Sequence, residues 1–310
     1  MSDFWDITAK LKELRAKSAP GSEPPPGPAY KDVGAQRIPV ESVQVEPASR
    51  LITFIDPYSP GADRFRLLRL KLQELWNTGK LKTLLITSAL PQEGKSTVAL
   101  NLATSLAQGG KRVLLVEADL YSPSIAQKLG LQHKPGLVEC LELGWNPWST
   151  IRQLEPLGFF FISAGTISKA PMELQADAVE DILQKLVDQF DWILIDAPPV
   201  MPLTDAMILA RQTDATLLVA RNGRTPREAI AKAISYVGRQ RVLGIVLNGI
   251  EGLEQLYSRY HGYYANRGGV STQPALQPGN AIAYLDMPKP ADPQKPQDGS
   301  NLPAVRNRRD

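Results

Sequence analysis

Short apolar runs of strand length alternate along the middle of the chain with segments whose apolar residues recur at helical spacing. The runs cover residues 83–87, 112–116, 159–162, 192–195, 215–219 and 243–247. Nearly continuous aliphatic and β-branched runs are typical of strands buried on both faces, and helices between them predict βαβ units. The pattern therefore predicts an α/β fold with a doubly wound, mainly parallel sheet.

Proline-rich segments without such periodicity flank this region. They cover residues 18–49 and 266–310 and contain many of the chain's 26 prolines. Segments of this composition bury too little apolar surface to offset the entropy that a chain loses on folding. We expect a disordered Pro-rich linker at 18–49, a domain at 50–265 and a disordered Pro-rich tail at 266–310.

The start of the chain forms a separate unit. Its apolar residues recur at helical spacing, at Phe4, Ile7, Leu11 and Leu14. This spacing predicts a short amphipathic helix over residues 1–17. The helix is either a frayed surface helix or a docking helix for a membrane surface or a partner protein.

The composition narrows the class of protein. The chain has 310 residues, of which 43% are hydrophobic and 22% charged, as in ordinary globular proteins. Its formal net charge of +3 leaves no surplus of cations for a phosphate backbone, which argues against nucleic-acid binding. Cys140 is the only cysteine, so we expect no intramolecular disulfide and a reducing compartment. No apolar run approaches the roughly 18 residues of a spanning helix, and the acidic start is unlike a secretory signal, so we expect a cytoplasmic protein.

The strongest local motif is Ala89-Leu-Pro-Gln-Glu-Gly-Lys-Ser96, a relaxed phosphate-loop pattern with alanine in the first glycine position. It directly follows an expected strand and opens an apolar-periodic helix, which is the context that such a loop requires. Backbone N–H groups around Gly94 would hold phosphate oxygens at the positive end of the helix. Lys95 would bind the β- and γ-phosphates, and the Ser96 hydroxyl would ligate Mg²⁺.

Carboxylates end two of the expected strands. Glu117 and Asp119 follow the run at 112–116, and Asp196 ends the run at 192–195 in a Walker B pattern. The carboxyl ends of parallel strands are where α/β sheets bind their ligands. A lone aspartate at such a place is often only a helix cap. Three carboxylates beside a phosphate loop favour a site for ATP and Mg²⁺.

In order and spacing these motifs resemble the bacterial tyrosine kinases, P-loop NTPases of deviant-Walker type that act as autokinases in capsule and exopolysaccharide export. The resemblance covers about residues 50–265 and rests on segments 91–96, 116–120 with Pro123, 195–199 and 246–249. It implies an ATP-dependent protein-tyrosine autokinase that regulates the polymerisation and export of a polysaccharide. It also implies recruitment to the inner face of the cell membrane through the cytoplasmic tail of a membrane adaptor, or polysaccharide co-polymerase.

The resemblance also implies roles for individual residues. Catalysis is implied for Lys95, Glu117, Asp119 and Asp196, and magnesium ligation for Ser96, Asp119 and Asp196. Nucleotide contacts are implied for Pro91, Gln92, Glu93, Gly94, Lys95, Ser96, Thr97 and Asn248. In such kinases the second acidic motif, here Glu117 and Asp119, supplies the base for the incoming tyrosine.

Four of the nine tyrosines lie close together near the end of the expected domain, at Tyr257, Tyr260, Tyr263 and Tyr264. One interpretation is an aromatic helix face. The adjacent His261-Gly262 argues against a buried stripe, and the cluster matches the autophosphorylation segment of the resembled family. We interpret these tyrosines as phosphoacceptors, modified in trans and reset by a phosphotyrosine phosphatase. Each phosphate would add nearly two negative charges.

Asp63, Arg66 and Arg69 stand at three-residue intervals, similar to the Glu-x-x-Arg-x-x-Arg oligomerisation motif of the same family. The alternative is a solvated amphipathic helix with an internal ion pair, worth on the order of a few tenths of a kcal/mol. Beside the other motifs, the pattern favours an interface in a homo-oligomer. A ring of subunits could present the tyrosines of one chain to the active site of its neighbour.

Two departures from the family pattern leave other hypotheses open. Glu117 and Tyr121 stand where the family has aspartate and arginine, and the longer glutamate moves its carboxylate by roughly 1 Å, a scale that alters catalysis. ATP binding should survive, so a catalytically weak nucleotide-binding regulator or scaffold of the same export system is a second hypothesis. A partitioning-type ATPase is a third, but those proteins carry a lysine just after the first glycine of the loop, where this chain has Leu90.

Overall fold

The described part of the chain forms one nine-stranded sheet. The computed structural model describes residues 38–77, 81–166, 176–202, 204–250 and 281–286. The strands are β1 (Val40–Ser42), β2 (Thr83–Ser88), β3 (Val113–Glu117), β4 (Arg152–Glu155), β5 (Phe159–Ile162), β6 (Trp192–Asp196), β7 (Ala215–Arg221), β8 (Val242–Ile250) and β9 (Ala281–Asp286). Their order across the sheet is β1-β4-β5-β3-β6-β2-β7-β8-β9. All neighbours from β5 to β8 are parallel, which confirms the predicted mainly parallel sheet.

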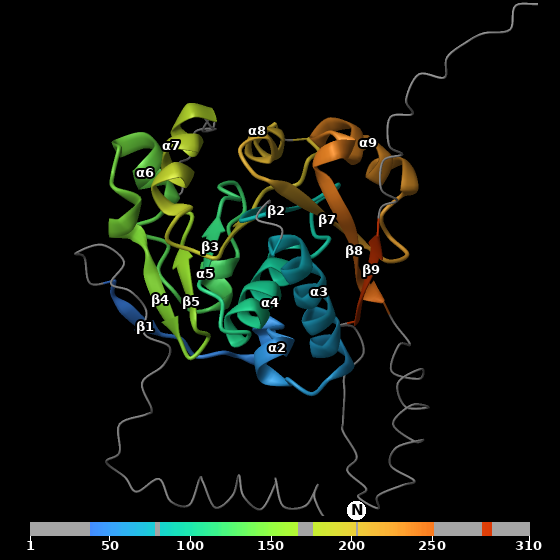
Figure 1. Cartoon of the computed structure of the whole chain (residues 1–310), viewed down its shortest axis with the longest axis horizontal. Helices are drawn as coiled ribbons and strands as arrows, with labels where there is room; N and C mark the ends of the chain where they lie inside the picture. Colours follow the sequence, from blue (N-terminus) through green and yellow to red (C-terminus); the bar gives the residue numbers. More distant parts are fainter. Residues whose placement is uncertain (1–37, 78–80, 167–175, 203, 251–280, 287–310) are drawn as a thin grey trace, which may run out of the picture.

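Helices cover both faces of this sheet (Figure 1). One face carries α2 (Ile52–Ile55), α3 (Pro60–Trp76), α4 (Lys95–Gln108) and α5 (Ile125–Lys128). The other carries α6 (Leu137–Leu143), α7 (Ala176–Leu186), α8 (Asp205–Arg211) and α9 (Arg227–Val237). Short 3-10 helices span Pro47–Ser49, Pro147–Thr150 and Arg239–Arg241. Helical layers on both sides of a parallel sheet give the doubly wound fold that the sequence predicts.

Successive side chains along each central strand enter two separate hydrophobic clusters. In β5, Phe159 and Phe161 pack with residues of α3 and α4, whereas Phe160 packs with residues of α7 and α8. In β6, Trp192 and Ile193 divide between the two clusters in the same way. Neighbouring side chains on a strand point to opposite faces of the sheet, and both faces are covered by helices. Every position along these strands is therefore buried and can be apolar.

Two boundaries predicted from proline content are wrong. The linker predicted at 18–49 includes β1 and the helix Pro47–Ser49, and Val43 packs into the core with 7% exposure. A few apolar residues among the prolines suffice here because β1 pairs with β4. The tail predicted as disordered at 266–310 includes β9, which is antiparallel to β8. An outer strand presents unpaired N–H and C=O groups, and a short apolar run can pair with them.

Several sequence predictions lie outside the described residues. They are the amphipathic helix at 1–17, the linker before residue 38, the tyrosine cluster and the remainder of the tail. Within the described ranges, no helix combines the length and the apolar character needed to span a bilayer.

A buried asparagine joins the phosphate-loop helix to the segment before it. Asn101 in α4 is fully buried, and its Oδ1 accepts the N–H of Thr53 at 3.1 Å. Its Nδ2 donates to the carbonyls of Arg50 at 3.0 Å and Thr97 at 2.9 Å. One side chain therefore fixes α2 and Arg50 against the first turn of α4.

We expect Asn101→Leu to lower the free energy of unfolding by about 2–4 kcal/mol, because a buried N–H and a buried carbonyl lose their partner. Ser105→Ala in the same helix is the matched control. The Ser105 hydroxyl is buried and has no hydrogen-bond partner among the described residues, so its removal should be neutral or slightly stabilising. Urea unfolding of the three proteins measures both effects. Equal losses for the two variants would contradict this account.

Candidate functional site

The loop between β2 and α4 adopts a conformation that requires glycine at one position. Gly94 has a φ of 95°, and a Cβ there would lie 2.0 Å from Nδ2 of Asn248. That amide donates to the carbonyl of Glu93 at 2.9 Å, and this hydrogen bond attaches the loop to the end of β8. Gln92 also has a left-handed φ, of 62°. Helix α4 begins at Lys95, so its unpaired N-terminal N–H groups belong to this loop and favour an anion.

The side chain of Glu93 is directed into the protein. It is 4% exposed, and one carboxylate oxygen accepts the N–H of Leu90 at 3.0 Å. The other accepts the hydroxyl of Thr225, which lies between β7 and α9. Glu93 therefore braces the loop through its carboxylate and leaves its backbone for any nucleotide contact.

Lys95 and Asp119 form a buried ion pair across the site. The ammonium of Lys95 lies 2.6 Å from Oδ2 of Asp119 and donates to the hydroxyl of Ser96 at 3.2 Å. Burial alone would lower the pKa of Lys95, but the carboxylates of Asp196 and Asp119 outweigh it and raise this pKa. Lys95 therefore stays charged and is held close to two carboxylates.

Asp196 at the end of β6 is fully buried. Neither of its carboxylate oxygens has a hydrogen-bond partner within the described part of the chain, although the hydroxyl of Ser96 lies near. Burial raises the pKa of the Asp196 carboxyl from 3.8 to about 6, while Lys95 and the Ser96 hydroxyl act in the opposite direction. An unpartnered buried carboxylate is costly, and a divalent cation is the group that such oxygens bind. The donor set of Asp196 and Ser96 thus fits Mg²⁺.

Glu117 lies in register with Asp196 on the neighbouring strand, but its carboxylate is already occupied. One oxygen accepts the N–H groups of Ser124 at 2.6 Å and Ile125 at 2.5 Å, and the other accepts the N–H of Ala164 at 3.4 Å. Glu117 thereby holds the first turn of α5 against the end of β3. The catalytic role of Glu117 stays a prediction, whereas its hydrogen bonds to α5 give it a structural role.

A cavity of about 270 Å³ opens beside the phosphate loop. Its walls include loop residues 92 and 94–97, together with Asn248 and three basic side chains, Arg50, Lys128 and Arg221. None of these three cations was predicted from the sequence. Arg221 ends β7 and could have been found by the strand-end argument that found Asp196. Lys128 gave no signal, because α5 is too short to show a helical pattern.

The predicted interface residues lie on α3. Asp63 and Arg66 pair with each other, and Arg66 also donates to the carbonyl of Pro57. Arg69 donates to the carbonyl of Ser105 at 2.6 Å, near the end of α4. Burial lowers the pKa of Arg69, and the charge of Arg66 adds to this shift. The internal ion pair of the alternative hypothesis is therefore present, and the interface itself stays a prediction.

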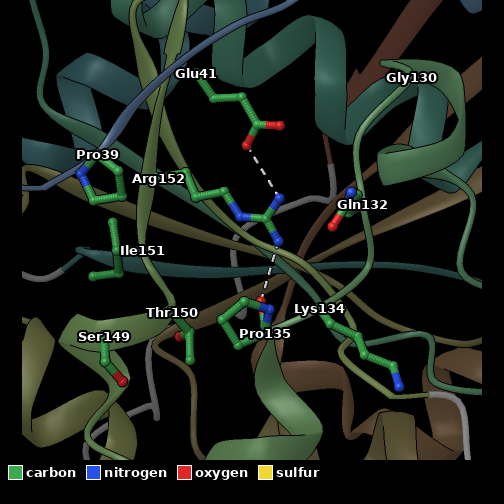
Figure 2. A pocket seen from close by; sticks show the side chains of 10 residues that line it. All are labelled: Pro39, Glu41, Gly130, Gln132, Lys134, Pro135, Ser149, Thr150, Ile151 and Arg152. Carbon is green, nitrogen blue, oxygen red and sulfur yellow. Dashed lines mark hydrogen bonds and ion pairs between the residues drawn. The ribbon is translucent and has the colours of Figure 1, made fainter.

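A second cavity, of about 510 Å³, lies beside β1 and β4, the two strands at one side edge of the sheet. Figure 2 shows the guanidinium of Arg152 between Glu41 and Pro135. It donates to the Glu41 carboxylate, to the Pro135 carbonyl and to the Ser163 hydroxyl, each at 3.1 Å. With 8% exposure, Arg152 joins the edge strand β1 to the loop after α5. Its charge is matched within the protein, so we assign this cavity no ligand.

The chain is similar to several known proteins. The family model ParA, described as NUBPL iron-transfer P-loop NTPase, matches residues 81–270. Tyrosine-protein kinase YwqD of Bacillus subtilis is 30% identical over 220 residues, which cover 70% of this chain and 92% of YwqD. Succinoglycan biosynthesis transport protein ExoP of Rhizobium meliloti is 30% identical over 67% of this chain but only 29% of its own length. The kinase domain of Escherichia coli tyrosine kinase ETK superposes with a TM-score of 0.62 at 27% identity, over 64% of this chain and 80% of that domain.

Proposed function

Because this chain belongs to the bacterial tyrosine kinases, which share the P-loop NTPase fold, we propose that it phosphorylates tyrosines within a polysaccharide export system. The observation that carries this proposal is the buried, unpartnered carboxylate of Asp196 beside Lys95 and the N-terminus of α4. The name of ExoP, a succinoglycan biosynthesis transport protein, supports the export context. The same system would recruit the chain to the inner face of the cell membrane through the cytoplasmic tail of an adaptor.

Each group of the site has a role in this proposal. Lys95 and the N–H groups of the loop bind the β- and γ-phosphates of ATP, and Ser96 and Asp196 hold Mg²⁺. Bound Mg²⁺ supplies positive charge at the terminal phosphates. A tyrosine hydroxyl, with a pKa near 10, needs a carboxylate to accept its proton at neutral pH. We assign this role to Asp119, whose carboxylate pairs with Lys95 at 2.6 Å and accepts one backbone N–H, that of Ser122 at 3.0 Å. The carboxylate of Glu117 accepts three backbone N–H groups.

The acceptors we propose are Tyr257, Tyr260, Tyr263 and Tyr264, phosphorylated in trans and reset by a phosphotyrosine phosphatase. A homo-oligomer would bring one chain's tyrosines to another's site through α3. Beside the Asp63–Arg66 pair, Leu67 and Leu70 on this helix are 43% and 53% exposed, as suits a contact between subunits. Arg69, the third residue of this proposed interface, also donates to the carbonyl of Ser105 within the subunit.

Phosphotyrosine mass spectrometry after incubation with Mg-ATP tests the proposal. We expect label confined to residues 257–264, and a loss of at least about a hundredfold in Lys95→Met, which removes the cation at the phosphates. The reaction is repeated with the cytoplasmic tail of the adaptor.

A second candidate function is a nucleotide-dependent regulator with little transfer activity. The hydrogen bonds of the Glu117 carboxylate favour this second function. A carboxylate that accepts the N–H groups of Ser124 and Ile125 is less able to accept the proton of a tyrosine hydroxyl. ATP binding without label, even with the adaptor tail present, would establish this alternative and exclude the kinase.

A further inference from the structure

The nucleotide cavity holds more positive charge than its phosphate loop supplies. The charge of Lys95 is already matched by Asp119 at 2.6 Å. Three further cations, Arg50, Lys128 and Arg221, line the same cavity. None of the three side chains forms an ion pair within the described residues, so their charge is available to an anion.

Lys128 stands on the short helix α5, at one side of this cavity. It is half-buried, and the one hydrogen-bond partner of its ammonium in the described ranges is the hydroxyl of Ser124, at 3.1 Å. An ammonium carries three donors, so two remain. Because Lys128 lines the nucleotide cavity, these two donors can serve an anion bound there.

Lys128 is electrostatically coupled to the charged groups of the phosphate site. Burial lowers its pKa, the carboxylates of Asp196 and Glu117 raise it, and the charges of Lys95 and Arg50 lower it further. Its ammonium therefore lies within the field of the same carboxylates and the same lysine that form the phosphate site.

The position of Lys128 is also fixed by the backbone. Glu117 accepts the N–H groups of Ser124 and Ile125 at the start of α5, and Lys128 stands at the end of this one-turn helix. A strand-end carboxylate thus holds the helix whose last residue reaches the cavity. These hydrogen bonds give Glu117 a role in positioning Lys128, independent of any proton transfer.

We propose that Lys128 binds the phosphate oxygens of the nucleotide, as a second cation beside Lys95. The inference rests on the proposed nucleotide site and adds a binding residue to it. Because the ammonium of Lys95 is shared with Asp119, Lys128 offers the charge that an arriving phosphate meets without first breaking an ion pair.

Titration calorimetry with Mg-ADP and with a non-hydrolysable Mg-ATP analogue tests this, using Lys128→Met, Lys128→Arg and the exposed control Lys185→Met on α7. We expect Lys128→Met to weaken binding at least tenfold and to reduce its salt dependence, because one charge contact is lost. Lys128→Arg should stay within about threefold of the original, since the charge remains. Lys185→Met should bind as the original does.

A measurement on the unaltered protein covers the case in which Lys128→Met fails to fold. We expect Mg-ADP to protect Lys128 and Lys95 from acetylation, read by mass spectrometry, and to leave Lys185 unprotected. Binding by the original protein together with unchanged affinity of Lys128→Met, or equal acetylation of Lys128 with and without Mg-ADP, overturns the inference alone. Absence of any nucleotide binding by the original protein overturns the proposed function as well.

Discussion

Asp196→Asn should make the nucleotide-free protein more stable at pH 7.5 while removing its magnesium-dependent nucleotide binding. The carboxyl is fully buried, its oxygens have no partner in the described ranges, and its pKa is raised from 3.8 to about 6. At neutral pH the folded protein therefore carries a charged Asp196 carboxylate at a buried position that favours the neutral carboxyl. The difference between these two pKa values corresponds to at most about 3 kcal/mol.

The stability difference between Asp196→Asn and the original protein should depend on pH. Between about pH 6 and pH 3.8 the folded protein binds a proton at Asp196 and the unfolded chain does not, so acid stabilises the original fold relative to the variant. The advantage of Asp196→Asn should therefore be full above pH 6 and should vanish as the pH approaches 4. Thermal unfolding across this range measures it.

Asp119→Asn is the matched control for Asp196→Asn. It removes the carboxylate that pairs with Lys95 at 2.6 Å, so it should destabilise the protein at pH 7.5. The magnesium-dependent gain in ADP affinity should fall by about a hundredfold in Asp196→Asn, because the carboxylate that fits the cation is gone. An Asp196→Asn variant that is less stable than the original at pH 7.5 would contradict the account.

Gly94→Ala should abolish nucleotide binding, with a loss of at least about a hundredfold. The added Cβ would lie 2.0 Å from Nδ2 of Asn248, and a φ of 95° adds about 1–3 kcal/mol of strain for a residue with a side chain. The loop must then leave the conformation in which its N–H groups face the cavity. Calorimetry with Mg-ADP measures the loss.

Two further variants separate the clash from the strain. Gly110→Ala has a similar φ of 77° but no neighbour within 4 Å, so it should lose about 1 kcal/mol of stability and keep its affinity. Adding Asn248→Ala to Gly94→Ala removes the clash and should restore part of the binding. Normal affinity in Gly94→Ala alone would show that this loop conformation does not matter for the nucleotide.

The centre of the sheet and its ligand edge could be predicted because both follow from local pattern. A run such as 159–162 has no polar position, which requires cover on both faces. In a parallel sheet the carboxyl ends of the strands lie along the same side, so residues that end neighbouring strands are close together. Glu117 and Asp196 are such a pair and lie in register. The hydrophobic pattern therefore located the site before any side-chain contact was known.

The remaining features depend on tertiary contacts that leave little trace in the sequence. Strand β1 has three residues, and its Val40 is 55% exposed, so no periodicity marks it. Glu117 and Glu93 both stood in recognisable motifs, yet the structure uses their carboxylates to hold backbone N–H groups. A motif identifies which residue stands at a place, whereas its partners decide what the side chain does.

The position of Ile250 at the end of β8 limits the distance from the sheet at which the proposed acceptor tyrosines can lie. Ile250 and Ala281 are partners in the antiparallel pair of β8 and β9, so the chain between them leaves and returns at one place on the rim of the sheet. Tyr257 follows Ile250 by seven residues, and a fully stretched chain spans at most about 3.5 Å per residue. That tether is about 25 Å long. A neighbouring subunit can receive Tyr257 only if its own nucleotide lies within about 25 Å of this Ile250. Tyr264 follows Ile250 by 14 residues, so for the last acceptor the same limit is about 50 Å.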